Sequence, residues 1–412
     1  MKNYILVTMG TSGDVNPFVG LGRALKERGH KVVLLTNPYF EKFILDAELE
    51  FLPIGTTEEY IEGINDPDLW HPVKSATVIL NRIILPNIKI VYEIIEELCR
   101  NGDNIIVSSS MALGARIAQE KLNIPLCTTY YLQPSLRSDR EAMGFSFPDW
   151  MPGLLTRSIF ALMDRLLIDR AICGKLNEVR TELGLEPVKI GTLSKWINSP
   201  QLVLCLYPEW LKPFQPGWPK NTVQTGFAYY DGAIDYKQSE SVMQFIESGE
   251  PPIVFTPGTG VVNEEQFFRV AVESVQALKK RALLCTKHSS QVPAKLPDSV
   301  MYADYVPFNL VLPKAALIVH HGGMGTMVQA MSAAIPQIIR PMAHDQFQNG
   351  NLVKKLGVGT VIKREKFTVN NVTEKLDYLL ASETVAGKCR EIAGKFDNFG
   401  YLEKTCNILE SL

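Results

Sequence analysis

"VHHGGMGTMVQAMSAA", residues 319–334, places two of the chain's six histidines directly before a group of glycines. An apolar run over 315–319 precedes the glycines, as expected of a strand buried on both faces of a parallel sheet. After Gly325, apolar residues recur at helical spacing. The stretch therefore predicts a strand, a glycine-rich loop and a helix, the repeating unit of a doubly wound α/β domain.

The glycine-rich loop has the chemistry of a phosphate-binding site. Glycines let backbone N–H groups approach a ligand without an intervening Cβ, and the start of a helix carries a partial positive charge. The Thr326 hydroxyl can bond a phosphate oxygen, while a histidine before the glycines can donate an N–H and add its own charge. The alternative is a plain strand end followed by a tight turn, and the spacing alone leaves both open.

The rest of the chain shows the same alternation in two series. Its 412 residues exceed the size at which one hydrophobic core stops growing, so two domains are expected. Four prolines within 206–220 interrupt the pattern and indicate a linker. We therefore expect an N-terminal domain over 1–206, a linker over 207–221, a C-terminal domain over 222–392 and a terminal helix over 393–412.

Composition excludes several classes of protein. A formal net charge of −2 argues against a nucleic-acid binder, and the seven scattered cysteines lack metal-site or disulfide spacing. No apolar run is long enough to span a bilayer, and the N-terminus lacks a signal-peptide core, so we expect a cytoplasmic protein. "GTSGDV" is not a dinucleotide fingerprint, and no metal-binding motif occurs, so neither a redox cofactor nor a metal is expected.

Asp14 follows the first predicted strand, at the carboxyl edge of the sheet where α/β proteins bind ligands. We expect the first helix to start after it, with Asn16 as the cap. Asp14 is then either a functional carboxylate or a helix-capping residue, and the sequence leaves both open.

Two segments resemble known proteins. "HHGGMGTMVQAMSAAIPQIIRPMAHDQFQNG" resembles the donor-binding signature of family 1 glycosyltransferases, and "VTMGTSGDVNPFVGLGRALKERGHKV" is similar to the N-terminal segment of the sterol and antibiotic glycosyltransferases and the rhamnolipid rhamnosyltransferase. The resemblance implies the GT-B fold, in which two Rossmann-like α/β domains face a central cleft. It also implies an inverting, metal-independent transfer of a hexose, glucose or rhamnose, from UDP- or dTDP-sugar to a hydroxyl of a lipophilic small molecule.

The resemblance further implies a role for individual residues. Asp14 takes the place of the general base, and His321 that of the histidine bonding the donor diphosphate. Gln329 replaces a glutamate that grips the ribose in many plant members, which leaves the choice between UDP and dTDP open. The full donor-binding set implied is Gly258, Thr259, Val306, His321, Gly323, Gly325, Thr326, Gln329, Asp345 and Gln346.

The segment 145–176 is aromatic and then amphipathic, with basic residues among apolar ones. It is interpreted as helices packed on the first domain, as the edge of an apolar acceptor pocket lined by Phe145, Phe147 and Trp150, or as a patch resting on the inner face of a membrane. The acceptor could be a sterol, polyketide, phenol or hydroxy fatty acid. A nucleotide-sugar 2-epimerase and a non-catalytic nucleotide-sugar binder are the alternative functions.

Overall fold

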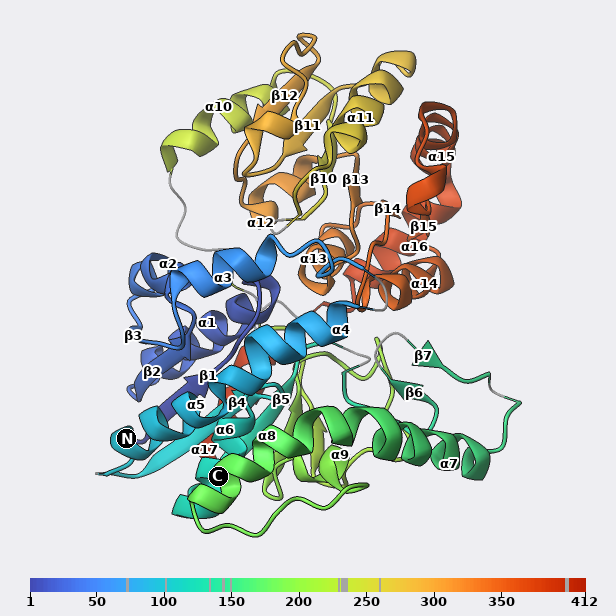
Figure 1. Ribbon diagram of the computed structural model, residues 1–412. Helices are drawn as coiled ribbons and strands as arrows, with labels where there is room; N and C mark the ends of the chain where they lie inside the picture. The colour runs from blue at the N-terminus through green and yellow to red at the C-terminus, as the bar shows by residue number, and fades with distance from the viewer. Residues whose placement is uncertain are drawn as a thin grey trace. The chain divides into compact units, whose positions relative to one another are not determined.

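The computed structural model divides into two compact units, Met1–Tyr230 with Phe399–Leu412, and Asp231–Asn398. We call them the N-terminal and C-terminal units. Each is described by itself (Figure 1). The structure describes residues 1–71, 74–100, 102–132, 135–142, 145–148, 150–228, 230, 236–258, 261–396 and 400–412, without the side chains of 236–239.

The N-terminal unit alternates strands and helices along most of its length. Its elements are β1 (Asn3–Val7), α1 (Ser12–Glu27), β2 (Lys31–Thr36), η1 (Pro38–Phe40), α2 (Glu41–Asp46), β3 (Glu50–Pro53), α3 (Thr57–Ile64), α4 (Ser75–Val78), η2 (Ile79–Ile84), α5 (Leu85–Leu98), β4 (Asn104–Ser109), α6 (Leu113–Leu122), β5 (Leu126–Tyr130), β6 (Glu141–Ala142), β7 (Phe145–Ser146), α7 (Gly153–Met163), η3 (Asp164–Ile168), α8 (Asp169–Glu182), α9 (Leu193–Trp196), β8 (Leu202–Cys205), β9 (Thr222–Gln224) and α17 (Gly400–Glu410).

A parallel sheet in the order β3-β2-β1-β4-β5-β8-β9 forms the centre of this unit. Successive residues of a strand point to opposite faces, and β1 shows this directly. Tyr4 and Leu6 enter one hydrophobic cluster, whereas Ile5 and Val7 enter another. Both faces of the sheet are therefore buried, which explains why the strand sequences are apolar throughout rather than alternating.

The C-terminal helix α17 belongs to the N-terminal unit and packs on α1. Glu410 at its end accepts hydrogen bonds from the Arg28 guanidinium at 2.8 Å and contacts His30 Nε2 at 2.8 Å. These partners lower the pKa of Glu410 to about 2. The last helix is thus held by a charge cluster as well as by buried Cys406 and Leu409.

The proline-rich stretch over 206–221 connects two neighbouring strands of one sheet. It joins β8 to β9, which are paired in parallel, and Trp218 within it is buried with its indole N–H donating to Leu136 O at 3.1 Å. The two units instead divide after Tyr230. Prolines suit a crossover that carries no helix as well as they suit a linker, so their presence alone does not locate a domain boundary.

The C-terminal unit contains the second α/β series. Its elements are α10 (Tyr236–Glu247), β10 (Ile253–Thr256), α11 (Glu265–Ala277), β11 (Ala282–Cys285), η4 (Ser289–Gln291), β12 (Val300–Ala303), α12 (Phe308–Val311), η5 (Leu312–Lys314), β13 (Leu317–His320), α13 (Met324–Ser332), β14 (Gln337–Ile339), α14 (Gln346–Leu356), β15 (Gly359–Val361), η6 (Arg364–Lys366), α15 (Val369–Ala381) and α16 (Glu383–Ala393).

These strands form a parallel sheet in the order β12-β11-β10-β13-β14-β15. The order reverses direction between β10 and β13, and such a switch point is where open α/β sheets bind ligands, outside the carboxyl ends of the strands. The quoted stretch over 319–334 begins in β13 and continues through α13. The sequence motif therefore lies at the switch point of this sheet.

Candidate functional site

The predicted donor-binding residues converge on the carboxyl edge of the C-terminal sheet. The last residues of β10, β13 and β14 are in register, because Thr256 pairs with His320 and His320 with Ile339. Gly258 follows β10, His321 follows β13 and the Asp345–Gln346 pair follows β14. Parallel pairing thus brings three loops, distant in sequence, to one place.

His320, the first of the paired histidines, braces the glycine loop from within the sheet. It is fully buried, its Nδ1 accepts a hydrogen bond from Gly322 N at 3.1 Å, and its Nε2 lies 3.0 Å from Gln337 Oε1. Burial lowers the pKa of His320 to about 4. The ring is therefore neutral at pH 7, with its proton on Nε2, which allows both hydrogen bonds at once.

His321 faces the other way and packs between two glycines. A Cβ on Gly258 would lie 2.8 Å from its ring, and a Cβ on Gly323 would lie 2.5 Å from its Nε2, so any side chain at either position would clash. Its Nδ1 is buried without a hydrogen-bond partner among the described residues. An unpartnered buried nitrogen is costly, so a ligand group is the natural partner for this ring.

The expected positive charge on His321 is absent from the structure. Burial, assisted by His320 and His344, lowers the pKa of His321 to about 3. A neutral imidazole can still donate one N–H to an anion, but it adds no net charge. The positive end of the α13 dipole is then the charge that this edge offers.

Helix α13 starts at Met324 with Gly323 as its cap, one residue earlier than predicted. The first amides of a helix have no partner inside it, and here they belong to Met324, Gly325 and Thr326. The space beside Gly325 is open, since a Cβ there would meet no atom within 4 Å. Gln329 lies further along α13, and Thr259 lies outside the described residues.

Asp345 and Gln346 are both buried and serve the loops around them. The Gln346 Oε1 accepts hydrogen bonds from Met342 N at 2.7 Å and Ala343 N at 3.1 Å. Asn349 Nδ2 donates to Asp345 Oδ2 at 2.7 Å and to Gly322 O at 2.8 Å. Asn349, which the sequence analysis missed, therefore connects the Asp-Gln pair to the glycine loop.

The remaining predicted residues of this unit lie on the same edge or beside it. Val306 follows β12, and its side chain is buried in the hydrophobic cluster under α12 and α13. The main chain of Val306 is therefore the part that a ligand could contact. His344, directly before Asp345, has a left-handed backbone with φ of 58°.

A buried ion pair supports this edge from below. Arg340, just after β14, lies 2.9 Å from Glu264, and both side chains are almost fully buried. The guanidinium also lies over the rings of Phe267 and Phe367, and Arg340 N donates to His320 O at 2.8 Å. A buried charge pair that is well enclosed holds its elements in one arrangement, and removing one partner would be costly.

In the N-terminal unit, Asp14 lies in the first turn of α1, which begins at Ser12 instead of after Asn16. Its Oδ2 accepts hydrogen bonds from Thr11 N at 2.6 Å and Thr11 Oγ at 3.1 Å, which is the capping interaction. Its Oδ1 accepts from the Tyr131 hydroxyl at 2.8 Å. The capping interpretation is confirmed, and the cap uses only Oδ2, so a functional role for this carboxylate stays a prediction.

Tyr131 directly follows β5, and Asp14 follows β1, so both lie at the carboxyl edge of their sheet. Burial raises the pKa of Asp14, while the hydrogen bonds from Tyr131 and Thr11 act in the opposite direction. The rule that ligands bind outside the strand ends could have identified Tyr131 from the sequence, since "CTTYY" ends a strand.

The aromatic residues predicted to contact an acceptor gather at the start of α7. The rings of Phe145 and Phe147 lie 4.7 Å apart, and Phe147 lies 5.1 Å from Phe160 of α7. Trp150 is 79% exposed. Phe145 and Phe147 therefore form an aromatic edge to that helix, and Trp150 lies exposed just before the helix in sequence.

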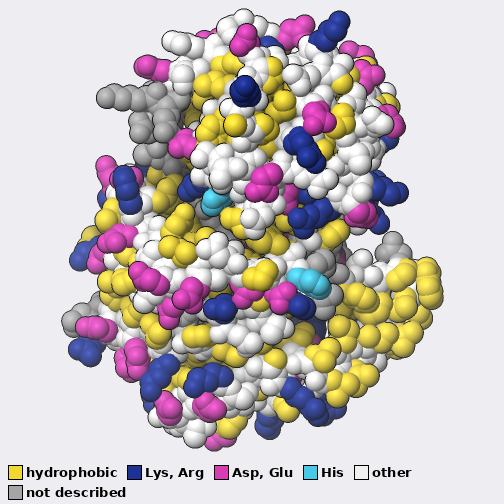
Figure 2. Space-filling view, turned by 45° about the horizontal axis from the view of Figure 1, so that its top comes forward, with side chains coloured by type: hydrophobic (Ala, Val, Ile, Leu, Met, Phe, Trp, Pro, Cys, Tyr) yellow, Lys and Arg dark blue, Asp and Glu magenta, His cyan; other side chains and the backbone are white. Residues whose placement is uncertain are grey.

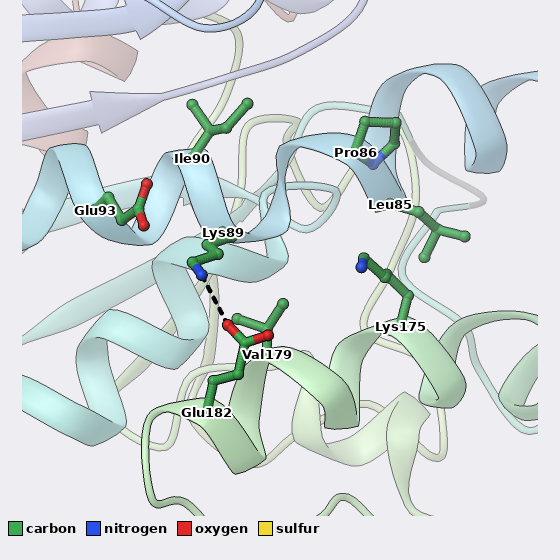
Figure 3. A pocket seen from close by; sticks show the side chains of 8 residues that line it. All are labelled: Leu85, Pro86, Lys89, Ile90, Glu93, Lys175, Val179 and Glu182. Carbon is green, nitrogen blue, oxygen red and sulfur yellow. Dashed lines mark hydrogen bonds and ion pairs between the residues drawn. The ribbon is translucent and has the colours of Figure 1, made fainter.

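A small pocket lies elsewhere on the N-terminal unit, between α5 and α8 (Figure 3). It measures about 300 Å³, and the ammonium of Lys89 lies 2.7 Å from the carboxylate of Glu182 across it. No predicted site residue lines it. In the described part of the chain, no three His, Cys, Asp or Glu side chains gather as metal ligands would.

Comparison with known families places both units. The family described as "Glycosyltransferase family 28 N-terminal domain" matches residues 4–138, and "Erythromycin biosynthesis protein CIII-like, C-terminal domain" matches 271–396. The second match contains the glycine loop and the Asp-Gln pair. In both units this chain is therefore similar to known families of glycosyltransferase and antibiotic-biosynthesis domains.

Its curated relatives include plant, fungal and bacterial glycosyltransferases. A sterol 3-beta-glucosyltransferase of Arabidopsis thaliana is 26% identical over 95% of this chain and 63% of its own length. The O-mycaminosyltylonolide 6-deoxyallosyltransferase of Streptomyces fradiae is 25% identical over 82% of this chain and 80% of its own length. This GT-B chain spans less than two thirds of the first relative and 24% of the Debaryomyces hansenii sterol 3-beta-glucosyltransferase.

Solved structures share the GT-B fold over the whole chain. The calicheamicin glycosyltransferase CalG4 superimposes with a TM-score of 0.74 at 17% identity, covering 100% of this chain and 98% of its own. The spinosyn rhamnosyltransferase SpnG gives a TM-score of 0.72 at 18% identity, with both chains covered to 100%. At such low identity the likeness shows the fold.

We predict that acid destabilises the C-terminal unit through His320. The pKa of His320 in the folded chain is about 4, below the ordinary value near 6.5. Between these two pH values the unfolded chain binds a proton at His320, whereas the folded chain does not. The free energy of unfolding should therefore fall as the pH falls through this window, by on the order of 3 kcal/mol at pH 4. Urea titrations at several pH values measure it.

His320→Asn is the matched variant, because its amide oxygen can replace Nδ1 as the acceptor for Gly322 N but does not titrate. Its free energy of unfolding should depend less steeply on pH between 6.5 and 4. An unaltered slope would show that His320 is not the group responsible.

Proposed function

We propose that this chain is an inverting, metal-independent glycosyltransferase that moves a hexose from UDP- or dTDP-sugar to a hydroxyl of a lipophilic small molecule. The observation that carries the proposal is the edge of the C-terminal sheet, where an unpartnered buried His321 nitrogen adjoins the open N-terminus of α13. That combination suits a diphosphate.

On the donor side, the α13 amides and the Thr326 hydroxyl bind phosphate oxygens, and the His321 ring donates its N–H. Gly258, Gly323 and Gly325 keep the approach free of side chains. The resemblance also assigns Thr259 to the phosphate oxygens. Asp345 and Gln346 bind sugar hydroxyls, the Val306 main chain contacts the base, and Gln329 contacts the ribose. The donors are fixed before the reaction, so they stabilise the charge that develops on the leaving diphosphate.

On the acceptor side, Asp14 is the general base. A carboxylate offers about four lone-pair sites. Among the described residues, two on Oδ2 are taken by Thr11 and one on Oδ1 by Tyr131. One site on Oδ1 remains, and a substrate hydroxyl can donate to it.

The reaction then follows with its atoms balanced. Asp14 takes the proton of the acceptor hydroxyl while that oxygen attacks the anomeric carbon of the sugar. The bond between this carbon and the diphosphate oxygen breaks, and the diphosphate leaves with its electron pair, stabilised by the α13 N-terminus. Attack from the side opposite the diphosphate inverts the anomeric carbon. Burial raises the pKa of Asp14, which makes it a better proton acceptor than an ordinary aspartate.

A lipophilic acceptor is supported by the relatives and by the aromatic edge. The names of the relatives cite a sterol and O-mycaminosyltylonolide, and the solved neighbours include calicheamicin and spinosyn glycosyltransferases. Phe145, Phe147 and Trp150 offer apolar surface to such a molecule. Thymidine diphosphate is bound in the solved SsfS6 and SpnG complexes, which keeps dTDP beside UDP as the nucleotide.

The function is tested by incubating the chain with UDP-glucose or dTDP-rhamnose and a set of sterol, polyketide, phenol and hydroxy fatty acid acceptors. We expect glycosylated product and release of nucleoside diphosphate with at least one pair. Sugar interconversion without acceptor would indicate a 2-epimerase, and binding without turnover a non-catalytic binder; either result would reject the proposal.

Asp14→Asn should lower the transfer rate by about 10²- to 10⁴-fold, because the amide cannot accept the proton. Nucleotide-sugar binding, measured by calorimetry, should persist, and so should thermal stability, since Asn can still accept from Thr11 N. Asp46→Asn on α2 is the matched control and should retain full activity. Turnover near the wild-type rate in Asp14→Asn would exclude the base role.

Tyr131→Phe should shift the acid limb of the profile of kcat/KM against pH to higher pH. The Tyr131 hydrogen bond favours the ionised form of Asp14, so its loss raises the pKa of Asp14 further. Because the base must be ionised, activity is then lost at a higher pH as the solution is acidified. An unshifted profile would mean that Tyr131 has only a structural role.

His321→Ala should weaken donor binding by about tenfold, the loss expected for one hydrogen bond to a charged group. It should also lower the transfer rate, because the same N–H stabilises the leaving diphosphate. Donor titration and steady-state rates measure both effects. His71→Ala in the N-terminal unit is the control, and equal binding by the two variants would contradict the role given to His321.

A further inference from the structure

A helix over 153–182, formed by α7, η3 and α8 without a break, has Asp164 and Asp169 turned inward, whereas Glu178 and Glu182 near its end are exposed. Asp164 is buried and lies 2.6 Å from the Arg137 guanidinium, and buried Asp169 accepts a hydrogen bond from Gly191 N. The inner side of this helix is thus fixed to the N-terminal unit by hydrogen bonds and charge.

Its outer side is apolar. Leu154 is 74% exposed, Leu162 57% and Leu167 63%. We use the term α7 face for the exposed side chains of Leu154, Leu155, Leu162, Leu166, Leu167 and Ile168. Figure 2 shows hydrophobic side chains gathered at the end of the N-terminal unit where Figure 1 places α7.

The pattern of the α7 face is that of an amphipathic helix. Leu155, Leu162 and Leu166 are seven and four residues apart, so they follow one line along the helix. From Arg165 to Ile168 four successive residues are exposed, within the π-helical segment η3, so this part of the helix projects from the unit. Trp150, also exposed, lies just before the helix.

Between residues 150 and 175 the exposed charges are all basic, although Lys175 lies 2.9 Å from the exposed carboxylate of Glu178. Arg157, Arg165, Arg170 and Lys175 are exposed, whereas both acids between 150 and 175 are buried. The Arg157 guanidinium lies 3.8 Å from the carboxylate of Asp139. An exposed apolar face flanked by cations and preceded by tryptophan is the composition of helices that lie in the interface of an anionic bilayer.

We propose that the α7 face docks the protein on an anionic lipid surface, with its apolar side chains entering the boundary between headgroups and acyl chains. Arg157, Arg165 and Arg170 bind the headgroups. In the described residues no helix is both long and apolar enough to cross a membrane. The docking does not depend on sugar transfer, although it would bring the protein to lipophilic acceptors.

A second copy of the chain fits the α7 face less well. In a two-fold dimer the same patch faces itself, so these three arginines would meet the same three. Like charges brought together across an interface oppose association. Anionic headgroups satisfy the charge and the apolar surface together.

The test is co-sedimentation of the full chain with vesicles of phosphatidylcholine alone or mixed with phosphatidylglycerol. We expect binding to the mixed vesicles that weakens as salt is added, because salt screens the headgroup contacts, and much weaker binding to phosphatidylcholine alone. Failure to bind the mixed vesicles, or equal binding to both, would overturn the proposal.

Two variants separate the apolar and charged contributions. Leu162→Ser with Leu166→Ser, and separately Arg165→Gln with Arg170→Gln, should each weaken vesicle binding at least about tenfold. Leu45→Ser with Tyr378→Ser changes exposed residues elsewhere and should bind as the wild type does. All three should unfold at the wild-type temperature, since they alter exposed side chains.

Light scattering on the same proteins completes the test. A monomer at all concentrations agrees with the proposal. If the wild type is a dimer and the variant Leu162→Ser with Leu166→Ser is a monomer, the α7 face is an interface with a second copy. That result would overturn the proposal. Full binding by either α7-face variant, or equal loss in the control, would do the same.

Discussion

The parallel register of β10, β13 and β14 is the constraint on which the candidate donor site depends. Because Thr256, His320 and Ile339 lie side by side, the loops that follow them leave the sheet at one edge. No single loop is a binding site by itself. The glycine loop supplies amides, the loop after β10 supplies Gly258, whose lack of a side chain leaves room for the His321 ring, and the loop after β14 supplies a carboxylate and an amide.

His320 and His321 have different roles: His320 holds the glycine loop, and His321 faces the two glycines. Adjacent residues of a strand point to opposite sides, so His320 faces inward to hold Gly322 while His321 faces the glycines. Each ring is neutral because burial disfavours its charged form. The loop is thus positioned by hydrogen bonds, and the attraction for an anion comes from the helix that follows.

Much of this architecture could be predicted from local pattern. The apolar strands and the strand-to-helix units follow from periodicity. The carboxyl edge that carries Asp14 in one sheet, and the edge that carries His321 in the other, follow from the rule for ligand sites in α/β sheets. The GT-B fold expected from the resemblance is confirmed by the solved neighbours. The start of α1 and the connection made by 206–221 depend on tertiary packing. The sequence therefore predicted too late a start for α1, and it interpreted 206–221 as a linker between domains instead of a connection between β8 and β9.

Contacts between residues distant in sequence were beyond the sequence analysis. Tyr131 reaches Asp14 from a strand two places away in the sheet, and Arg340 reaches Glu264 across the C-terminal unit. The charge state of His321 was also missed, because burial is a property of the folded chain. Asn349 is different: it lies four residues after Asp345 on one helix, a spacing that could have been recognised.

Asn349 has a consequence for the donor site proposed above, in which the glycine loop binds the phosphates and Asp345 the sugar. One amide nitrogen donates to both the carboxylate of Asp345 and the carbonyl oxygen of Gly322, so a shift of either acceptor would be passed to the other through a single rigid group. Binding of the sugar at Asp345 would therefore strengthen the binding of the phosphates at the glycine loop without any movement of the helices. Affinity for the intact donor would then exceed what its two halves, measured as separate fragments, would suggest.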